Sequence, residues 1–202
     1  RLKGNTKMIE IQELCKSYGE KKVLNRVTFT LEPGTVTAVM AASGVGKTTL
    51  LRILMGLEKP DSGRILGLDG LRLAAVFQED RLCENLSPLS NVRLVTGNAV
   101  GREEILHGLK AVGLENCVSQ PVRELSGGQR RRAALVRALC PPWDLLLLDE
   151  PFKGLDHKTR QMVMEYVRKC LLSRPESYTV LVTHDREEAE YLAEQVFFLE
   201  RV

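Results

Sequence analysis

The sequence predicts an α/β fold built on a mainly parallel β-sheet. Three short runs, at residues 35–40, 145–148 and 178–182, are almost wholly apolar, which is typical of strands buried on both faces. Longer amphipathic segments with the period of a helix alternate with these runs. In addition, a strand, a loop of small residues and a helix follow one another over residues 35–55. Together these observations indicate a layered α/β protein.

The length and composition of the chain limit the number of domains and the classes of protein it can belong to. The chain has 202 residues, 44% of them hydrophobic and 27% charged, which suits one globular α/β domain. No apolar run reaches the roughly 18–20 residues of a membrane span, and the start shows no signal-peptide pattern. The net charge of +3 is too small to indicate nucleic acid as a partner. None of the five cysteines forms a C-x-x-C pair, so we expect free thiols in a reducing compartment.

The N-terminal part predicts a small antiparallel subdomain. Residues 8–14 and 23–31 alternate as strands do, and they lie too close together in the chain for a parallel crossover. Residues 60–63 predict a turn, and residues 65–73 a strand interrupted by glycines. A short apolar strand then ends at Gln78.

The second half predicts helices and the remaining strands. Residues 80–100 show no clear period. Helices are expected at 103–112, 129–139, from a cap at Asp156 to about 172, and at 187–194, with a last strand at 196–199. The arginines at 130–132 are expected on a solvated helix face rather than at a nucleic-acid interface.

A loop of small residues between the strand at 35–40 and the next helix predicts a phosphate site. It reads Ala41-Ala42-Ser43-Gly44-Val45-Gly46-Lys47-Thr48-Thr49. Small residues let backbone N–H groups turn toward a phosphate, and the helix adds its free N-terminal donors. Lys47 can reach the terminal phosphates, and the Thr48 hydroxyl can bind Mg²⁺. Ala41 stands where the phosphate-loop motif G-x-x-x-x-G-K-[ST] has glycine. If that position needs a positive φ, alanine costs free energy; if it does not, Ala41 is harmless.

Polar residues follow the predicted parallel strands. Lys47, Gln78, Asp149 and His184 all lie at strand carboxyl ends, where ligands bind in such sheets. Asp149 can hold Mg²⁺, and Glu150 can deprotonate a water that attacks a γ-phosphoryl group. The alternative is a strand-end pair of carboxylates that caps a helix or faces solvent.

A loop at residues 125–129 precedes the helix at 129–139. Ser126 suits an N-cap, and Gly127 and Gly128 let the backbone approach an anion. Taken alone, this loop is explained better by an ordinary capped helix than by a functional site.

The chain resembles the ATP-binding subunit of ABC transporters. Within that family, the segment Arg72-Leu73-Ala74-Ala75-Val76-Phe77-Gln78 and the short chain resemble the nitrate, sulfonate and taurine importer group. Residues 41–48 resemble the Walker A loop, and residues 145–150 Walker B with its glutamate. Leu125-Ser126-Gly127-Gly128-Gln129 matches the LSGGQ signature, and Gly154-Leu155-Asp156 resembles the D-loop. Gln78 resembles the Q-loop glutamine and His184 the switch histidine, and the motifs occur in the family's order.

The resemblance implies a P-loop NTPase in a single domain, residues 1–202. The nucleotide-binding core with its antiparallel β subdomain would comprise about 1–78 and 140–202, and a small helical subdomain with the signature about 79–139. The cofactors implied are ATP and Mg²⁺. Tyr18 would stack on adenine, or else is an ordinary core or surface tyrosine.

Roles for the other residues follow from the same resemblance. Gln78 would touch Mg²⁺ and the attacking water, and His184 would contact the γ-phosphate. Residues 126–129 and the D-loop Asp156 would act on ATP held by a second subunit, in a head-to-tail dimer. Lys153 and Gly154 depart from the usual D-loop serine and alanine, which bears on communication across the dimer and not on ATP binding.

The implied function is ATP hydrolysis that powers transport, most simply import, through separate transmembrane permease subunits, with an extracytoplasmic substrate-binding protein. The chain would lie on the cytoplasmic face of the membrane, and no appended regulatory domain is expected. One alternative is a soluble ABC ATPase not coupled to transport, although the segment between Gln78 and Ser126 is too short for the coiled coil of the repair type. The other alternative is a nucleotide-gated binding module that does not hydrolyse ATP. The presence of Glu150 and His184 argues against this alternative.

Overall fold

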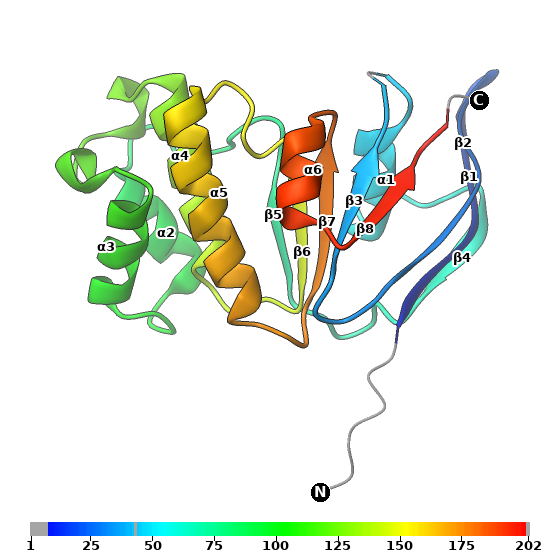
Figure 1. Ribbon diagram of the computed structural model, residues 1–202, viewed down its shortest axis with the longest axis horizontal. Coiled ribbons are helices and arrows are strands. Elements are labelled where there is room, and N and C mark those ends of the chain that lie inside the picture. Colours follow the sequence, from blue (N-terminus) through cyan, green and yellow to red (C-terminus); the bar gives the residue numbers. More distant parts are fainter. Residues whose placement is uncertain (1–7, 43, 201–202) are drawn as a thin grey trace, which may run out of the picture.

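A five-stranded parallel sheet forms the centre of the computed structural model, which describes residues 8–42 and 44–200 (Figure 1). Residues 1–7, 43 and 201–202 lie outside the described part. The strand order is β5-β6-β7-β3-β8, and each neighbouring pair is parallel. The strands are β3 (Val36–Met40), β5 (Leu73–Val76), β6 (Leu145–Asp149), β7 (Tyr178–Thr183) and β8 (Gln195–Phe198). The predicted α/β class with a parallel sheet is confirmed.

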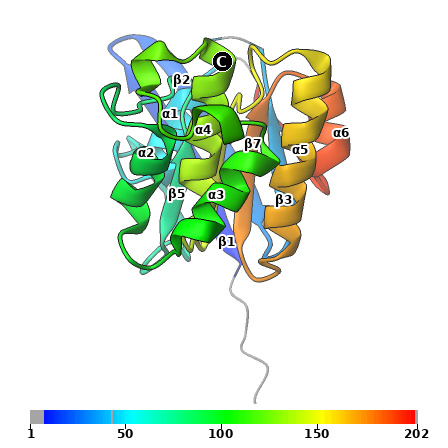
Figure 2. The ribbon, with the colours of Figure 1, turned by 90° about the vertical axis from the view of Figure 1, so that its left-hand side faces the viewer.

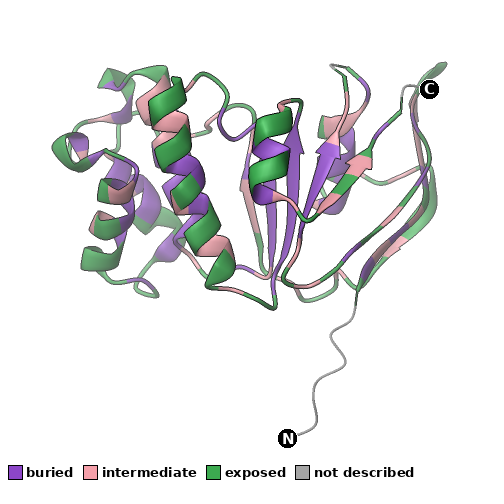
Figure 3. Ribbon diagram, viewed as in Figure 1, coloured by how far each residue is buried: buried purple, intermediate pink, exposed green. Residues whose placement is uncertain are grey.

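The two central strands β6 and β7 are buried along their whole length (Figure 3). This burial explains why their sequences are apolar throughout, since both faces are covered. Their side chains alternate between two cores: Leu146 and Leu148 enter one, and Leu145 and Leu147 the other.

A second, antiparallel sheet has the order β2-β1-β4, with β1 (Ile9–Tyr18), β2 (Lys21–Leu31) and β4 (Ser62–Leu66). The two predicted N-terminal strands are confirmed. The turn expected at 60–63 is wrong, because Ser62 and Gly63 already belong to β4. Gly63 has a φ of +86°, and a Cβ there would lie 2.4 Å from the Glu13 carbonyl oxygen, so glycine permits close strand pairing at a bulge. The broken strand expected at 65–73 is likewise wrong: β4 ends at Leu66, and β5 begins at Leu73.

The helices are α1 (Lys47–Leu54), α2 (Pro88–Thr96), α3 (Arg102–Ala111), α4 (Gly127–Leu139), α5 (His157–Leu172) and α6 (Arg186–Leu192), with 3₁₀ turns η1 (Glu115–Cys117) and η2 (Val122–Glu124). The four helices expected after residue 100 are present. Helix α2 lies in the segment where no period was visible. Its start signal is local: the Ser87 side chain accepts from the Ser90 N–H, and Pro88 occupies the first turn.

The helices and sheets form three groups along the long axis of the molecule. Helices α2, α3 and α4 gather at one end, the antiparallel sheet lies at the other, and the parallel sheet lies between them (Figures 1 and 2). One core joins these helices and α5 to one face of the parallel sheet, and the other joins α1 and the antiparallel sheet to the opposite face. Among the described residues, no helix combines the length and apolar character that crossing a membrane requires.

Candidate nucleotide site at the carboxyl ends of the parallel strands

The loop between β3 and α1 is shaped by glycine. Gly46 is the N-cap of α1, with a φ of +108°. A Cβ at this position would lie 2.8 Å from the Val23 carbonyl oxygen, so no larger residue fits without a shift of the backbone. Gly44 also has a positive φ, of +80°, but open space surrounds its Cα. Of the loop residues expected to bind nucleotide, Ser43 lies outside the described residues.

Ala41 fits its position without strain. Among the described residues, the non-glycine positions with positive φ are Glu13, Arg26, Arg81 and Glu150, and Ala41 is not one of them. The replacement of the motif's glycine therefore carries no left-handed backbone penalty. The Ala41 carbonyl also accepts a hydrogen bond of 2.8 Å from Lys47 Nζ. The rest of the loop sequence is Ala42, Val45, Thr48 and Thr49, of which Val45 and Thr49 are buried.

Lys47, Glu150 and His184 meet at the ends of three neighbouring strands. Lys47 Nζ lies 3.5 Å from Glu150 Oε1, and both side chains are about nine-tenths buried. His184 Nδ1 lies 2.9 Å from Oε1 and 2.8 Å from Oε2 of the same carboxylate. The His184 side chain is nevertheless 67% exposed, so the ring lies between Glu150 and open solvent. A carboxylate, a lysine ammonium and an imidazole are thus held in one cluster.

The backbone of Glu150 is unusual. Its φ is +49°, in the left-handed region that few non-glycine residues adopt. Its N–H donates to the Val182 carbonyl at 2.9 Å, which anchors the residue to β7 just beyond the end of β6. Strained backbone of this kind is concentrated at functional sites, where the surrounding structure enforces it.

Asp149 and Thr48 line a common hollow of about 280 Å³. Phe77, in the loop after β5, lines the same hollow. Asp149 is only 5% exposed. Burial raises the pKa of its carboxyl, the nearby Glu150 raises it further, and Lys47 opposes the rise. A buried carboxylate beside a hydroxyl offers the oxygen donors that Mg²⁺ prefers. No cluster of three or more His, Cys, Asp or Glu side chains within the described ranges could hold a metal. One carboxylate with nucleotide phosphates is the usual arrangement for Mg²⁺.

Gln78 follows the end of β5 and is exposed. Its backbone carbonyl accepts a hydrogen bond of 2.5 Å from Arg131 Nη2. The solvated arginine face expected at 130–132 is therefore wrong: Arg131 is 6% exposed and forms an ion pair with Asp80, and its neighbours donate to backbone carbonyls. The helical position of Arg131, four residues before Leu135 on the face toward the core, is the signal that could have revealed this.

Residues 126–129 begin α4 with a capping box. The Ser126 hydroxyl accepts from the Gln129 N–H at 3.3 Å, and the Ser126 N–H donates to Gln129 Oε1 at 2.8 Å. Gly127 opens the helix, and a Cβ on Gly128 would lie 3.4 Å from Leu155 Cδ2. Within this chain α4 lies toward one end of the molecule, apart from α1 (Figure 1).

The D-loop residues Lys153, Gly154 and Asp156 lead into α5. Gly154 has a φ of +80°, a conformation that glycine favours over the usual alanine. Lys153 is exposed, and its charge opposes the rise that burial causes in the pKa of Asp149. Asp156 Oδ1 accepts from the Thr159 N–H at 3.0 Å, so the expected cap is present.

Tyr18 ends β1 with its side chain half exposed. Its hydroxyl donates to Glu58, and Lys16 Nζ lies 5.7 Å from the ring centroid. The hydroxyl end of the ring is thus held, and about half of the side chain is exposed to solvent.

Glu188 is a site neighbour that sequence reasoning missed. The Thr183 hydroxyl donates to Glu188 Oε2 at 2.5 Å, and both residues are buried. The same hydroxyl accepts from the Asp185 N–H at 3.1 Å, so these contacts fix the backbone on both sides of His184. Burial raises the pKa of Glu188. The signal was a glutamate on the apolar face of a short helix.

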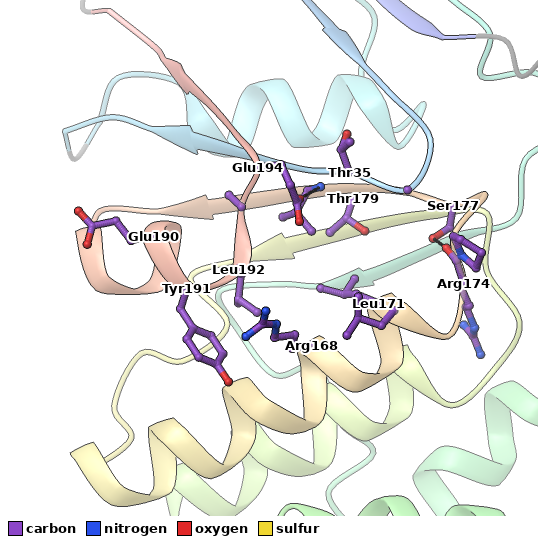
Figure 4. Close-up of a pocket in the computed structure, with 15 residues that line it drawn as sticks. Thr35, Arg168, Leu171, Arg174, Ser177, Thr179, Glu190, Tyr191, Leu192 and Glu194 are labelled. Atoms are coloured by element: carbon purple, nitrogen blue, oxygen red, sulfur yellow. Dashed lines mark hydrogen bonds between the residues drawn. The ribbon is translucent and has the colours of Figure 1, made fainter.

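Another hollow, of about 290 Å³, lies at the opposite end of the strands, between α5, α6 and the start of β3 and β7 (Figure 4). Arg168 lies over the Tyr191 ring there, and Glu194 accepts from the Val36 N–H. None of the predicted site residues lines it.

Comparisons with known proteins show the family of the chain. The sequence model of the ABC transporter family matches residues 24–153. The chain is 42% identical over 186 residues to an aliphatic sulfonates import ATP-binding protein of Rhodococcus jostii, covering 90% of this chain and 75% of the relative. It is 37% identical over 206 residues to a probable sulfate/thiosulfate import ATP-binding protein of Chlorella vulgaris, covering 95% and 87%.

Solved structures give the same result. A bacterial ABC transporter cassette, determined as a dimer, superposes with a TM-score of 0.83 at 30% identity and covers 95% of this chain and 94% of its own. A post-hydrolysis state of such a cassette, bound to ADP and phosphate, has a TM-score of 0.82 at 28% identity, with 95% and 94% covered.

Proposed function

Because this chain belongs to the ABC transporter family as an ATP-binding subunit that hydrolyses ATP, we propose that it drives solute import through a separate membrane permease. The observation that carries the catalytic part is the cluster of Lys47, Glu150 and His184 at the carboxyl ends of β3, β6 and β7. A phosphate loop, a buried carboxylate and an oriented base within contact of each other are what phosphoryl transfer to water requires.

In this proposal residues 41–49 bind the phosphates of ATP, and Tyr18 stacks on the adenine. Lys47 Nζ, which donates to the Ala41 carbonyl and lies beside Glu150, donates to the terminal phosphates when ATP is bound. Thr48, Asp149 and Gln78 would hold Mg²⁺, and their oxygen donors fit it. The ion supplies neutralisation of the phosphate charge.

Hydrolysis depends on Glu150 as general base. A water aligned with the γ-phosphoryl group gives a proton to the Glu150 carboxylate as its oxygen forms a bond to phosphorus, and the bond to the ADP oxygen breaks. His184, held against that carboxylate at 2.8 Å, orients it and contacts the γ-phosphate. Gln78 orients the same water.

The signature residues 126–129 and Asp156 act on ATP bound to a second copy of the chain. The separation of α4 from α1 within one chain supports this arrangement (Figure 1). Two chains then pack head to tail with two ATP molecules between them. Hydrolysis removes contacts that hold the dimer closed, which moves residues 79–139 as a helical subdomain against the core.

The partners are permease subunits, which hold the chain on the cytoplasmic face of the membrane, and an extracytoplasmic substrate-binding protein. The relatives' names give sulfonates, sulfate, polyamines and iron as imported solutes. Such variety fits a subunit that supplies energy while the permease selects the solute.

The test is Mg²⁺-dependent phosphate release from ATP. We expect Glu150→Gln to lose at least about 100-fold in kcat while it still binds ATP, because only the base is removed. Glu190→Gln, on the exposed face of α6, is the matched control and keeps parental activity. Hydrolysis by Glu150→Gln at the parental rate would show that another group is the base.

A further inference from the structure

Two arginines of α4 hold the segment that carries Gln78. Arg131 donates from Nη1 to the Phe77 carbonyl at 2.6 Å and from Nη2 to the Gln78 carbonyl at 2.5 Å. Arg137 donates to the Asp80 carbonyl at 2.9 Å and to the Arg81 carbonyl at 2.5 Å. One helix thus supplies the donors for the backbone carbonyls of four residues in the loop after β5.

Arg131 is the more buried and the more central of the two. It is 6% exposed, and its Nη1 also lies 3.2 Å from Asp80 Oδ1. Asp80 Oδ1 is itself buried and has no hydrogen-bond partner among the described residues apart from this ion pair. A planar guanidinium can serve two carbonyls and a carboxylate at once, which a lysine ammonium on a flexible stem cannot do in the same geometry.

The position of Arg131 links two parts of the proposed machinery. It lies in the second turn of α4, whose N-cap and first turn carry the signature residues Ser126 to Gln129. Burial and Glu150 raise the pKa of Asp149, and the charge of Arg131 is among those that oppose this rise. Gln78, by contrast, has an exposed side chain, so its placement depends on its backbone.

We propose that Arg131 is a positioning residue for Gln78: it fixes the Gln78 backbone and makes the glutamine follow any displacement of the signature helix. This role rests on the proposed function, in which Gln78 orients the attacking water. Because Arg131 joins α4 to the Gln78 backbone, a movement of α4 displaces Gln78. A loop bonded only to solvent would not follow that movement.

Kinetics of a double-mutant cycle tests the role. Arg131→Met should lower kcat about tenfold and change KM for ATP less than about twofold, because the phosphate loop is untouched. In a Gln78→Ala background the same change should lower kcat by less than about twofold, since Arg131 acts through Gln78. Equal losses in both backgrounds would overturn the proposal. Arg131→Lys should recover part of the rate.

A matched control is Arg132→Met. Arg132 donates to the Val112 and Gly113 carbonyls and, within its own helix, to the Gly128 carbonyl, and none of these contacts reaches Gln78. Its loss should lower the melting temperature comparably to Arg131→Met and leave kcat within about twofold of the parent. A tenfold fall in kcat for this variant too would mean that both arginines act only by stabilising the fold.

Hydrogen exchange without ATP separates this inference from the proposed function. Arg131→Met should speed amide exchange in residues 77–81 at least about threefold, whereas Arg132→Met should not. Unchanged exchange in Arg131→Met overturns the positioning role even if ATPase activity is present. If Arg131→Met exchanged faster but the parent protein never hydrolysed ATP, the positioning role of Arg131 would be supported and only the proposed function would be refuted.

Discussion

Lys47 and Glu150 form a buried ion pair, with 3.5 Å between Nζ and Oε1. Lys47 is the first residue of α1, whereas Glu150 follows the end of β6. The pair therefore ties the phosphate loop to the carboxylate that we propose as the base. Each charge offsets part of the cost of burying the other, so a change at either residue affects both.

Lys47→Ala should weaken ATP binding by at least about 100-fold, because it removes the only positive charge in the loop at 41–49 and leaves the buried Glu150 carboxylate without its lysine partner. Titration with a fluorescent ATP analogue measures the loss. Lys21→Ala, on an exposed position of β2, is the control and should bind as the parent does. If Lys47→Ala bound ATP with the affinity of the parent, Lys47 would not be a phosphate ligand.

Gly46→Ala and Gly44→Ala should differ sharply although both positions have a positive φ. At Gly46 the added Cβ meets the Val23 carbonyl oxygen at 2.8 Å, whereas at Gly44 nothing lies within 4 Å. We expect a loss of about 1 kcal/mol in the free energy of unfolding for Gly44→Ala and clearly more for Gly46→Ala. Urea unfolding measures both. Equal losses would mean that the contact with Val23 is easily relieved.

Ala41→Gly should leave the affinity for ATP within about twofold of the parent, because Ala41 has no left-handed backbone to relieve. Its free energy of unfolding should fall by about 0.4–1 kcal/mol, since glycine gives the unfolded chain more freedom. Nucleotide titration and urea unfolding provide the two numbers. A tenfold gain in affinity would show that alanine does strain the loop.

Much of the fold could be predicted because local signals and tertiary structure agree. The buried strands β6 and β7 are apolar throughout, and Asp156 caps α5 as its sequence indicates. The loop at 41–49 was recognisable since its chemistry depends on neighbouring residues.

Other features depend on contacts distant in sequence. Gly63 resembles a turn residue, but the approach of β1 sets its conformation. Arg131 resembles a surface charge until Phe77, Gln78 and Asp80 are placed around it. Glu188 likewise acquires its partner only when β7 and α6 pack. No local pattern contains these contacts.

Asp149→Asn should stabilise the protein without ATP at pH 7 and not at acid pH. Burial raises the pKa of Asp149 above its usual value of 3.8. The folded state therefore binds this proton more tightly, and the free energy of unfolding falls as the pH rises from 3.8 through the raised pKa. Asparagine removes that ionisation, so its advantage should be complete at pH 7 and vanish near about pH 3.

Urea unfolding of parent and Asp149→Asn at the two pH values measures this difference. The variant should at the same time lose Mg²⁺-dependent phosphate release. A variant less stable than the parent at pH 7 would show that the carboxylate has a stabilising partner stronger than its burial penalty.

The most direct test of the account is the mass in solution of Glu150→Gln, with and without ATP. Without hydrolysis, bound ATP should hold two chains together, so we expect a monomer alone and a dimer with ATP. Adding Lys47→Ala to this variant should abolish the dimer. If Glu150→Gln bound ATP and stayed monomeric, the result would contradict the claim that two chains dimerise around two ATP molecules without a further partner.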